Sequence, residues 1–461
     1  MDCRELAQKI VSLCRKKGAD HAEALVINQR EKAITAFKGQ VQLSGASDVT
    51  RFTVRLFRNH AGAIAVGRGY SERALEQIVE TAVVSALNSS PNKNLGPADP
   101  DDLGSLSNDL GIFDQRLENI SFDAMRELAL TAESSLARKD PRTAHLITST
   151  LQVQTQTVAL HISQGFNESY KATMATLHMS AVMDEYYNDL GARSSQIEEA
   201  KLAGTSSGVA RSLDGLSIDK TTTRTVEHLS TLSGARLSPR GWFPVVFSPL
   251  AARRVAMLML QLCSGPAASL LSSTRLGKID DRFCSPLITL VDDATHAGGV
   301  RTVPFDHEGV RPRRKTIIEQ GILREYLLNS YYARLLQRRS TGNAMAFEDV
   351  RFTVRPSNAY IEPGSASPAS IIGDIRQGFY VTQILSPAAH LSPSAANLAQ
   401  AVAGIWIENG RLAYPVRAAT LSAPLEDMLE NIVAVASDGD ADAPISSPTL
   451  MVSKMNVSPL M

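Results

Sequence analysis

Apolar residues in the first 90 positions follow two different periods. Residues 3–17 and 71–90 repeat them at helical spacing, and Ser71 is a suitable N-cap for the second segment. Between these segments lie three or four stretches in which apolar and polar residues alternate, as they do in strands. The pattern therefore predicts antiparallel strands backed by helices.

Residues 50–59 show this alternation most clearly. Every second residue from Phe52 to Leu56 is apolar, whereas Thr53 and Arg55 fall on the opposite face. We expect a sheet with one face in water, and Arg55 on that face.

The pattern changes several times before residue 240. Residues 89–110 are rich in Pro, Gly, Asp and Asn and indicate a connector. A helix is predicted at about 121–139, strands near 145–183, and a polar helical stretch at about 191–215.

Near residue 240 a buried element begins. Residues 243–247 read as a strand that leads into a helix, with Ser248 as N-cap and Pro249 at the first helical position. Gly265-Pro266 is expected to end that helix.

Hairpins dominate the remainder of the chain. The sequence predicts turns at Gln320-Gly321 and at Asn409-Gly410, and Asn-Gly is a strong hairpin signal. We predict an α+β protein with an N-terminal domain at 1–228 and a hairpin-rich C-terminal domain at 229–461.

Composition and charge narrow the class of protein. The 461 residues include 47 Lys and Arg against 47 Asp and Glu, so no net field favours nucleic acid. The local basic run at 311–315 is interpreted as a solvated rim. No apolar run reaches the length of a membrane span, the four cysteines form no C-x-x-C, and the start does not resemble a signal peptide. These features favour a cytoplasmic protein.

The stretch VPFDHEGVRPRRKTIIEQGIL, residues 303–323, holds the strongest candidate chemistry. Asp306, His307 and Glu308 are adjacent, so their side chains could converge on a cation. However, no second histidine follows at helical spacing, and Pro312 prevents a helix that would hold two ligands on one face. The better interpretation of His307 is a loop histidine with solvent partners.

Three weaker candidates have simpler explanations. Ser206 matches G-x-S-x-G, but the polar, helical context before it does not supply the strand that a nucleophile requires. Asp438, Asp440 and Asp442 lack the glycine and the final glutamate of a calcium loop and indicate an acidic surface loop. Cys263 ends an apolar helix and is interpreted as a buried thiol.

Several segments, in order, resemble the TldD/PmbA (TldE) peptidase family. The resemblance is carried by the 303–323 stretch and by RPSNAYIEPG, GFYVTQIL, GIWIENGRLAYPV and LEDMLENIVAVASD, and its order and spacing extend over nearly the whole chain. It implies one of two subunit types. The TldD type holds a catalytic metal with a His-Glu-x-x-x-His helix and a C-terminal Cys, and the PmbA/TldE type lacks them and pairs with it.

In this sequence the matching helix, residues 248–262, contains neither His nor Glu, and the C-terminal tail has no Cys. The resemblance therefore implies a PmbA/TldE-type subunit with no catalytic residue and no metal site. Zinc is expected in a TldD-like partner, and the substrate would be a peptide or an amide.

The resemblance also implies that the loop after residue 303 shapes the wall of a substrate chamber. Its candidate residues are Asp306, His307, Glu308, Arg313 and Arg314. One departure from the family pattern is the glycine-poor stretch 386–404, which suggests a divergent paralogue, such as one serving a natural-product pathway. Two alternatives stay open: a homodimeric peptide-binding scaffold, and an independent hydrolase that uses Ser206 or Cys263.

Overall fold

The structure, a computed structural model, describes a set of residue ranges that leaves short gaps. These ranges are 2–69, 71–107, 109–143, 147–187, 198–230, 234–271, 278–346, 352–385, 397–439 and 443–460. The glycine-poor stretch falls mostly between 385 and 397, and Asp440 and Asp442 also lie outside the described residues.

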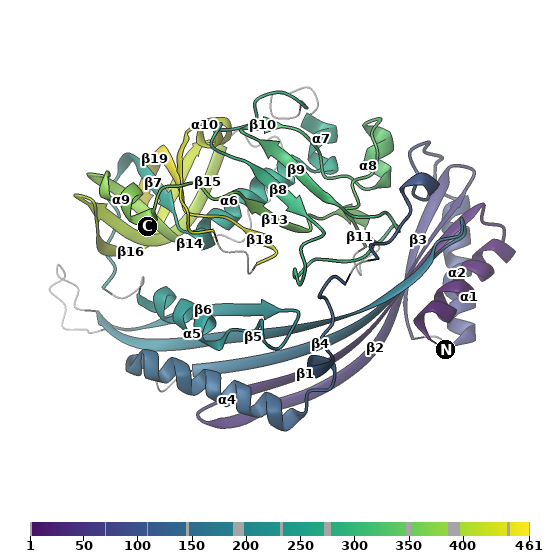
Figure 1. The fold of residues 1–461 in the computed structure, drawn as a ribbon, viewed down its shortest axis with the longest axis horizontal. Coiled ribbons are helices and arrows are strands. Elements are labelled where there is room, and N and C mark those ends of the chain that lie inside the picture. The colour runs from purple at the N-terminus through teal and green to yellow at the C-terminus, as the bar shows by residue number, and fades with distance from the viewer. Residues whose placement is uncertain are drawn as a thin grey trace.

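The N-terminal half is built on one long antiparallel sheet. Its strand order is β3-β2-β1-β4-β5-β6. The strands are β1 (His21–Phe37), β2 (Gln40–Arg58), β3 (Ala61–Arg68), β4 (Ile147–Ile162), β5 (Asn167–Tyr187) and β6 (Glu198–Ala210). Figure 1 shows the sheet as a curved layer beneath the C-terminal half.

Helices cover the face of this sheet that points away from the C-terminal half (Figure 1). Apolar residues of α1 (Cys3–Lys16) and α2 (Glu72–Leu87) pack on β1 and β2, and those of α4 (Phe122–Lys139) pack on β1 and β4. The helices predicted at 3–17, 71–90 and about 121–139 are confirmed, and the hydroxyl of Ser71 caps α2 by accepting a hydrogen bond from the backbone N–H of Ala74.

The three or four expected strand stretches form three strands, the first of which, β1, is continuous over 17 residues. One prediction for this half is wrong. The expected helix at 191–215 contains strand β6, against which α5 (Ile218–Ser230) packs. A hydroxyl group of this polar stretch helps to join β6 to α5, because Ser206 donates a 2.6 Å hydrogen bond to the carbonyl of Thr221.

The C-terminal half contains a small barrel. Its strands have the order β16-β15-β14-β7-β19-β17, and β16 also pairs with β19. They are β7 (Gly241–Phe247), β14 (Gln377–Ile384), β15 (Asn397–Glu408), β16 (Arg411–Pro424), β17 (Ile432–Val435) and β19 (Leu450–Pro459). The apolar residues of α6 (Pro249–Leu262) join the core of this barrel, beside the buried Trp406.

A second C-terminal sheet lies beside the barrel (Figure 1). Its strand order is β10-β9-β8-β13-β18. The strands are β8 (Leu290–Asp293), β9 (Arg314–Glu319), β10 (Ile322–Leu323), β13 (Asn358–Ile361) and β18 (Ile445–Ser446), and a separate pair is formed by β11 (Ala344–Ala346) and β12 (Phe352–Val354). Shorter helices are α3 (Gln115–Glu118), α7 (Gly265–Leu271), α8 (Ser330–Leu335), α9 (Pro368–Gly373) and α10 (Leu425–Glu430).

Both predicted hairpin turns are confirmed. Gln320 and Gly321 have φ values of 46° and 80°, and Asn409 and Gly410 have values of 49° and 76°. Two successive positive φ values are typical of the type I′ turn. Gly265-Pro266 follows the end of α6 as expected, but it also begins α7.

The proposed domain boundary at residue 228 falls inside α5, between the N-terminal sheet and the barrel. Among the described residues, no helix has the length and apolar character needed to cross a membrane.

Candidate functional site

Asp306 organises the loop between residues 303 and 310. Its Oδ1 accepts hydrogen bonds from the backbone N–H groups of Glu308 and Val310, both at 2.9 Å. Its Oδ2 accepts a third from Ala344, also at 2.9 Å, which ties the loop to β11. Burial, and the nearby charge of Glu308, raise the pKa of Asp306 to about 7.

Glu308 joins this loop to the N-terminal sheet. Its Oε1 lies 2.5 Å from Nη1 of Arg55 on β2, and its Oε2 accepts a 2.8 Å hydrogen bond from the backbone N–H of Ser330. Arg55 also pairs with Glu23 on β1, with Nε and Oε2 3.0 Å apart. The expectation that Arg55 faces water is wrong, because the loop covers this end of the sheet and leaves Arg55 only 6% exposed.

The two glutamates of this cluster respond differently to burial. Burial raises the pKa of Glu23 to about 7 despite its pairing with Arg55. Burial also acts on Glu308, but Arg55 and Ser330 outweigh it and lower the pKa of Glu308. Glu308 is therefore the ionised partner of Arg55 at neutral pH.

His307 has a protein partner at one of its two ring nitrogens. Its Nδ1 accepts a 3.0 Å hydrogen bond from the backbone N–H of Ala346. Burial and the nearby Arg355 lower the pKa of His307 to about 3, so the ring is neutral with its proton on Nε2.

The side chains of Asp306, His307 and Glu308 are not arranged as a catalytic zinc site. Asp306, His307 and Glu308 each have separate protein partners, so their side chains do not converge on one point. Polar side chains on α6 are limited to Arg253, Arg254 and Gln261, none of them a zinc ligand. Within the described ranges, no group of three His, Cys, Asp or Glu side chains could hold a metal.

The basic run after the loop is held by local partners. Arg313 pairs with Glu325, and Arg314 donates a 3.2 Å hydrogen bond to the hydroxyl of Tyr360. The expectation of a solvated rim is wrong for Lys315, whose Nζ is buried 3.1 Å from Oδ2 of Asp292. The β8–β9 pairing brings Lys315 beneath the sheet surface, where it can stay charged only beside a carboxylate.

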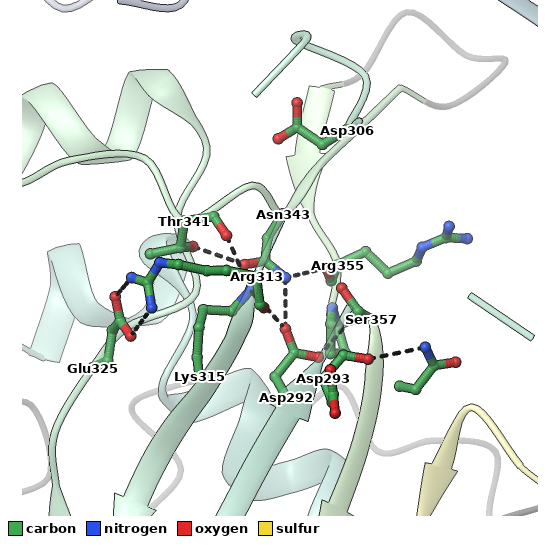
Figure 2. Close-up of polar contacts among 12 residues, drawn as sticks. Asp292, Asp293, Asp306, Arg313, Lys315, Glu325, Thr341, Asn343, Arg355 and Ser357 are labelled. Atoms are coloured by element: carbon green, nitrogen blue, oxygen red, sulfur yellow. Dashed lines mark hydrogen bonds and ion pairs between the residues drawn. The ribbon is translucent and has the colours of Figure 1, made fainter. Parts of the chain in front are cut away.

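Figure 2 shows the partners of the Asp292 carboxylate, both of whose oxygens accept hydrogen bonds. Besides Lys315, it accepts hydrogen bonds from the side-chain amide of Asn343 at 3.0 Å and from the backbone N–H of Ser357 at 2.6 Å. In the same view the guanidinium of Arg355 points away from this cluster.

Apolar contacts also hold the loop against the sheet. The ring of Phe305 packs edge-on against Phe166 and Tyr170, with centroids 5.2 Å from each. Gly309 has a φ of +77°, and a Cβ placed there would lie 2.9 Å from Cδ1 of Ile162. The loop is therefore the joint between the N-terminal sheet and the C-terminal half.

A cavity of about 830 Å³ lies beside this joint. One wall is the face of the N-terminal sheet that has no helix over it, and the other comes from residues 300–307, 345–346 and 355. His307 lines this cavity, whereas Asp306, Glu308, Arg313 and Arg314 do not appear in its wall. Its cationic lining consists of Arg51, Arg68, Arg211, Arg301 and Arg355.

Sequence reasoning missed the cavity arginines and the Arg55 cluster. Arg211 follows β6, Arg301 precedes the loop, and Arg355 follows β12, so no local motif connects them. One residue could have indicated the buried cluster from the sequence: Arg55 is a charged residue within a strongly apolar strand.

The weaker candidates have structural roles. Ser206 lies within β6, not on a strand-to-helix turn, and its hydroxyl is also 2.8 Å from that of Thr225. Cys263 is fully buried as predicted, and burial raises the pKa of its thiol. Asp438 accepts hydrogen bonds from the backbone N–H and hydroxyl of Thr449, at 2.8 and 2.7 Å.

Comparisons with known proteins agree with this architecture. Residues 240–459 match the family model of the PmbA/TldA metallopeptidase C-terminal domain. The chain is 24% identical to the Metalloprotease PmbA homolog of Haemophilus influenzae, over 99% of this chain and 96% of that protein. It is also 24% identical to Metalloprotease PmbA of Escherichia coli O157:H7, over 95% of this chain and 92% of that protein. The solved structure of TldE from Thermococcus kodakarensis has the same fold, with a TM-score of 0.81 at 18% identity over 98% of this chain and 100% of that one.

Proposed function

Because this chain belongs to the PmbA/TldD family, we propose that it is the PmbA/TldE-type subunit of a two-chain zinc metallopeptidase. In this role it binds a TldD-like partner and contributes interface and substrate chamber. The partner supplies the zinc and the glutamate that activates water for hydrolysis of a peptide or amide bond.

The observation that carries this proposal is the composition of α6. The resemblance implies that the metal-bearing subunit places His-Glu-x-x-x-His on the corresponding helix. Here eight of the residues of α6 are buried in the core of the barrel, and the helix offers no carboxylate and no imidazole. A full-length family fold with such a helix supports a subunit that depends on a partner for catalysis.

The loop of residues 303–310 fits a supporting role in the same complex. The carboxylate oxygens of Asp306 and Glu308 are occupied by backbone N–H groups and by Arg55 at the joint between the two halves. We therefore do not assign them a role in acid–base catalysis. We propose that they position the chamber wall, while Arg313 and Arg314 stiffen its edge through Glu325 and Tyr360.

The proposal places the pair in the cytoplasm. All four cysteines are free thiols, as expected in a reducing compartment. The stretch around 386–404 departs from the family pattern, and we propose that it adapts the chamber to a specialised substrate, such as an intermediate of a natural-product pathway.

Co-expression with a TldD-like chain from the same genome tests this function. We expect native mass spectrometry to find a one-to-one complex that contains zinc and hydrolyses peptides. Replacing the histidines of the partner's motif should abolish turnover, and this chain alone should show neither stoichiometric zinc nor turnover.

Two outcomes would contradict the proposal. Zinc-dependent hydrolysis by this chain alone would make it the catalytic subunit. Persistent self-dimers that never form the two-chain complex would instead favour a homodimeric peptide-binding scaffold.

A further inference from the structure

Three of the five arginines that line the cavity at the joint, Arg211, Arg301 and Arg355, are unusual because no carboxylate in the described part of the chain pairs with them. Within the described part of the chain, neither Asp nor Glu lines its wall. Buried guanidinium groups normally have a carboxylate partner, because an unpaired charge loses its hydration without compensation.

Two cations that are fully buried in the described part of the chain follow that rule. Arg55 lies between Glu23 and Glu308, and Lys315 lies against Asp292. These two pairs show that the fold supplies carboxylates where a buried cation is structural.

Three of the cavity arginines lack such a partner. Arg211 donates to the carbonyls of Thr173 and Val300, the second of them at 2.5 Å, and Arg301 donates to the carbonyl of Pro356 at 3.2 Å. Arg355 donates no side-chain hydrogen bond to any residue in the described ranges. The carboxylate that acts on Arg301 is Asp292, which Lys315 already holds.

The three guanidinium groups also influence one another. Burial, together with the charges of Arg301 and Arg211, lowers the pKa of Arg355 to about 10. Burial likewise lowers the pKa values of Arg211 and Arg301. All three stay protonated at neutral pH, so the cavity concentrates positive charge.

The remaining wall of the cavity is largely apolar. The open face of the sheet contributes Leu25 and Ile27 from β1, Val158 from β4 and Met174 from β5. The neutral ring of His307 adds its Nε2–H as a further hydrogen-bond donor. A volume of about 830 Å³ falls within the range of about 300–1,000 Å³ found for small-ligand sites.

We propose that this cavity binds the carboxylate of a ligand with an apolar body, and that in a peptide this group is the C-terminal carboxylate. Arg211, Arg301 and Arg355 receive the anion, and the face of β1, β4 and β5 receives the apolar side chains. The peptide as source of the carboxylate rests on the proposed function, whereas the anion site rests on the arginines alone.

Isothermal titration calorimetry on the full chain without a partner tests this site. The probes are acetyl-Leu-Val-Leu with a free C-terminal carboxylate, the same tripeptide with a C-terminal amide, and inorganic phosphate. We expect the free carboxylate to bind at least ten times more tightly than the amide, since a charged hydrogen bond contributes a factor of roughly 10 to 100.

Variants separate binding from folding. Arg355→Gln should weaken binding of the carboxylate roughly 10- to 100-fold, whereas Arg355→Lys should retain part of the affinity. The matched control is Arg126→Gln on α4, an arginine whose side chain is 53% exposed and distant from the cavity wall. Without ligand, Arg355→Gln should melt at the same temperature as the wild type or higher, because it removes a half-buried charge that lies near Arg301 and Arg211.

Each other outcome overturns the inference. Equal binding of carboxylate and amide, or no heat from either tripeptide at millimolar concentration, removes the carboxylate site. Phosphate binding more tightly than the tripeptide identifies a phosphate site instead, and a lower melting temperature for Arg355→Gln assigns Arg355 a structural role. None of these measurements involves the TldD-like partner, so a failed two-chain complex and a failed carboxylate site are distinguishable.

Discussion

Gly309 lies where the loop of residues 303–310 contacts the N-terminal sheet. Its φ of +77° strains any residue other than glycine, and an added Cβ would lie 2.9 to 3.2 Å from side-chain atoms of Ile162, Leu103 and Phe166. The contact with Ile162 of β4 explains why a Cβ at this position would be crowded.

Gly309→Ala should therefore lower the free energy of unfolding by roughly 2–4 kcal/mol, combining left-handed strain with a steric clash. Gly39→Ala is a matched control, because Gly39 has a φ of +71° and nothing within 4 Å of its Cβ position. The control should cost about 1 kcal/mol in urea unfolding. Equal losses for the two variants would show that the contact with Ile162 has no energetic importance.

Glu23 makes stability depend on pH. Its pKa rises from an ordinary value of 4.5 when unfolded to about 7 when folded. Between these values the folded protein holds a proton that the unfolded chain releases, so this group's stabilising contribution is lost as pH rises through the window.

Glu23→Gln should remove this contribution, making the slope of unfolding free energy against pH less negative by up to about 1.4 kcal/mol per unit between pH 4.5 and 7. The raised pKa of Asp306 should preserve part of the slope. Urea unfolding at intervals of half a pH unit measures it. The exposed Glu127→Gln on α4 is the control, and an unchanged slope in Glu23→Gln would contradict the assignment.

At the scale of elements, the amphipathic helices, the hairpins and most strands were predictable from the sequence, whereas the polar strand β6 was not. Caps such as Ser71 and turns such as Asn409-Gly410 act within a few residues, so the sequence encodes them locally. Strand β6 looked helical because its polar residues have no alternating apolar face. Its Ser206 hydroxyl instead forms hydrogen bonds with residues of α5. The local sequence pattern of the strand gives no sign of that helix.

A buried ion pair joins Asp292 on β8 to Lys315 on β9, and we expect it to stabilise the pairing of these strands. Lys315→Met should destabilise the protein by about 3–5 kcal/mol, because it leaves a buried carboxylate without its cation. Denaturant unfolding measures the loss. Adding Asp292→Asn should recover part of it, since the uncompensated charge is then removed.

Arg324→Met provides the comparison at an exposed pair. Arg324 lies 2.8 Å from Asp280, but its side chain is 40% exposed, so its loss should cost less than about 1 kcal/mol. If Lys315→Met costs no more than Arg324→Met, the buried pair does not stabilise the β8–β9 pairing.

At the scale of the whole molecule, the N-terminal sheet and the C-terminal half are joined by charged groups. Arg55 links β1 and β2 to Glu308, and Arg334 of α8 donates a 3.0 Å hydrogen bond to the carbonyl of Asn94. These contacts span more than 200 residues of sequence. We expect them to couple the stability of one half to that of the other.

Arg55→Met should cost about 3–5 kcal/mol and separate the unfolding of the two halves, because Glu23 and Glu308 lose their shared cation. The two tryptophans, Trp242 and Trp406, both lie in the C-terminal barrel, so fluorescence follows that half alone. Far-ultraviolet circular dichroism follows both halves. In the variant the circular dichroism transition should begin at lower urea than the fluorescence transition.

Arg58→Met, at the end of the same strand and outside the charged cluster, is the control for this experiment. It should leave the two transitions superimposed. Coincident transitions in Arg55→Met would show that the cluster does not couple the halves.

The sequence by itself determined most helices, their caps and the tight hairpins, because these features depend on neighbouring residues. It also showed directly that α6 contains neither His nor Glu. Only the tertiary structure decided which charges are buried. Arg55 looked solvent-facing and the cavity arginines looked unrelated, since each acquires its environment from strands and loops far away in the chain. Whether a charge is buried depends on residues far away in the chain. The periodicity of apolar residues reports only on secondary structure, which neighbouring residues decide.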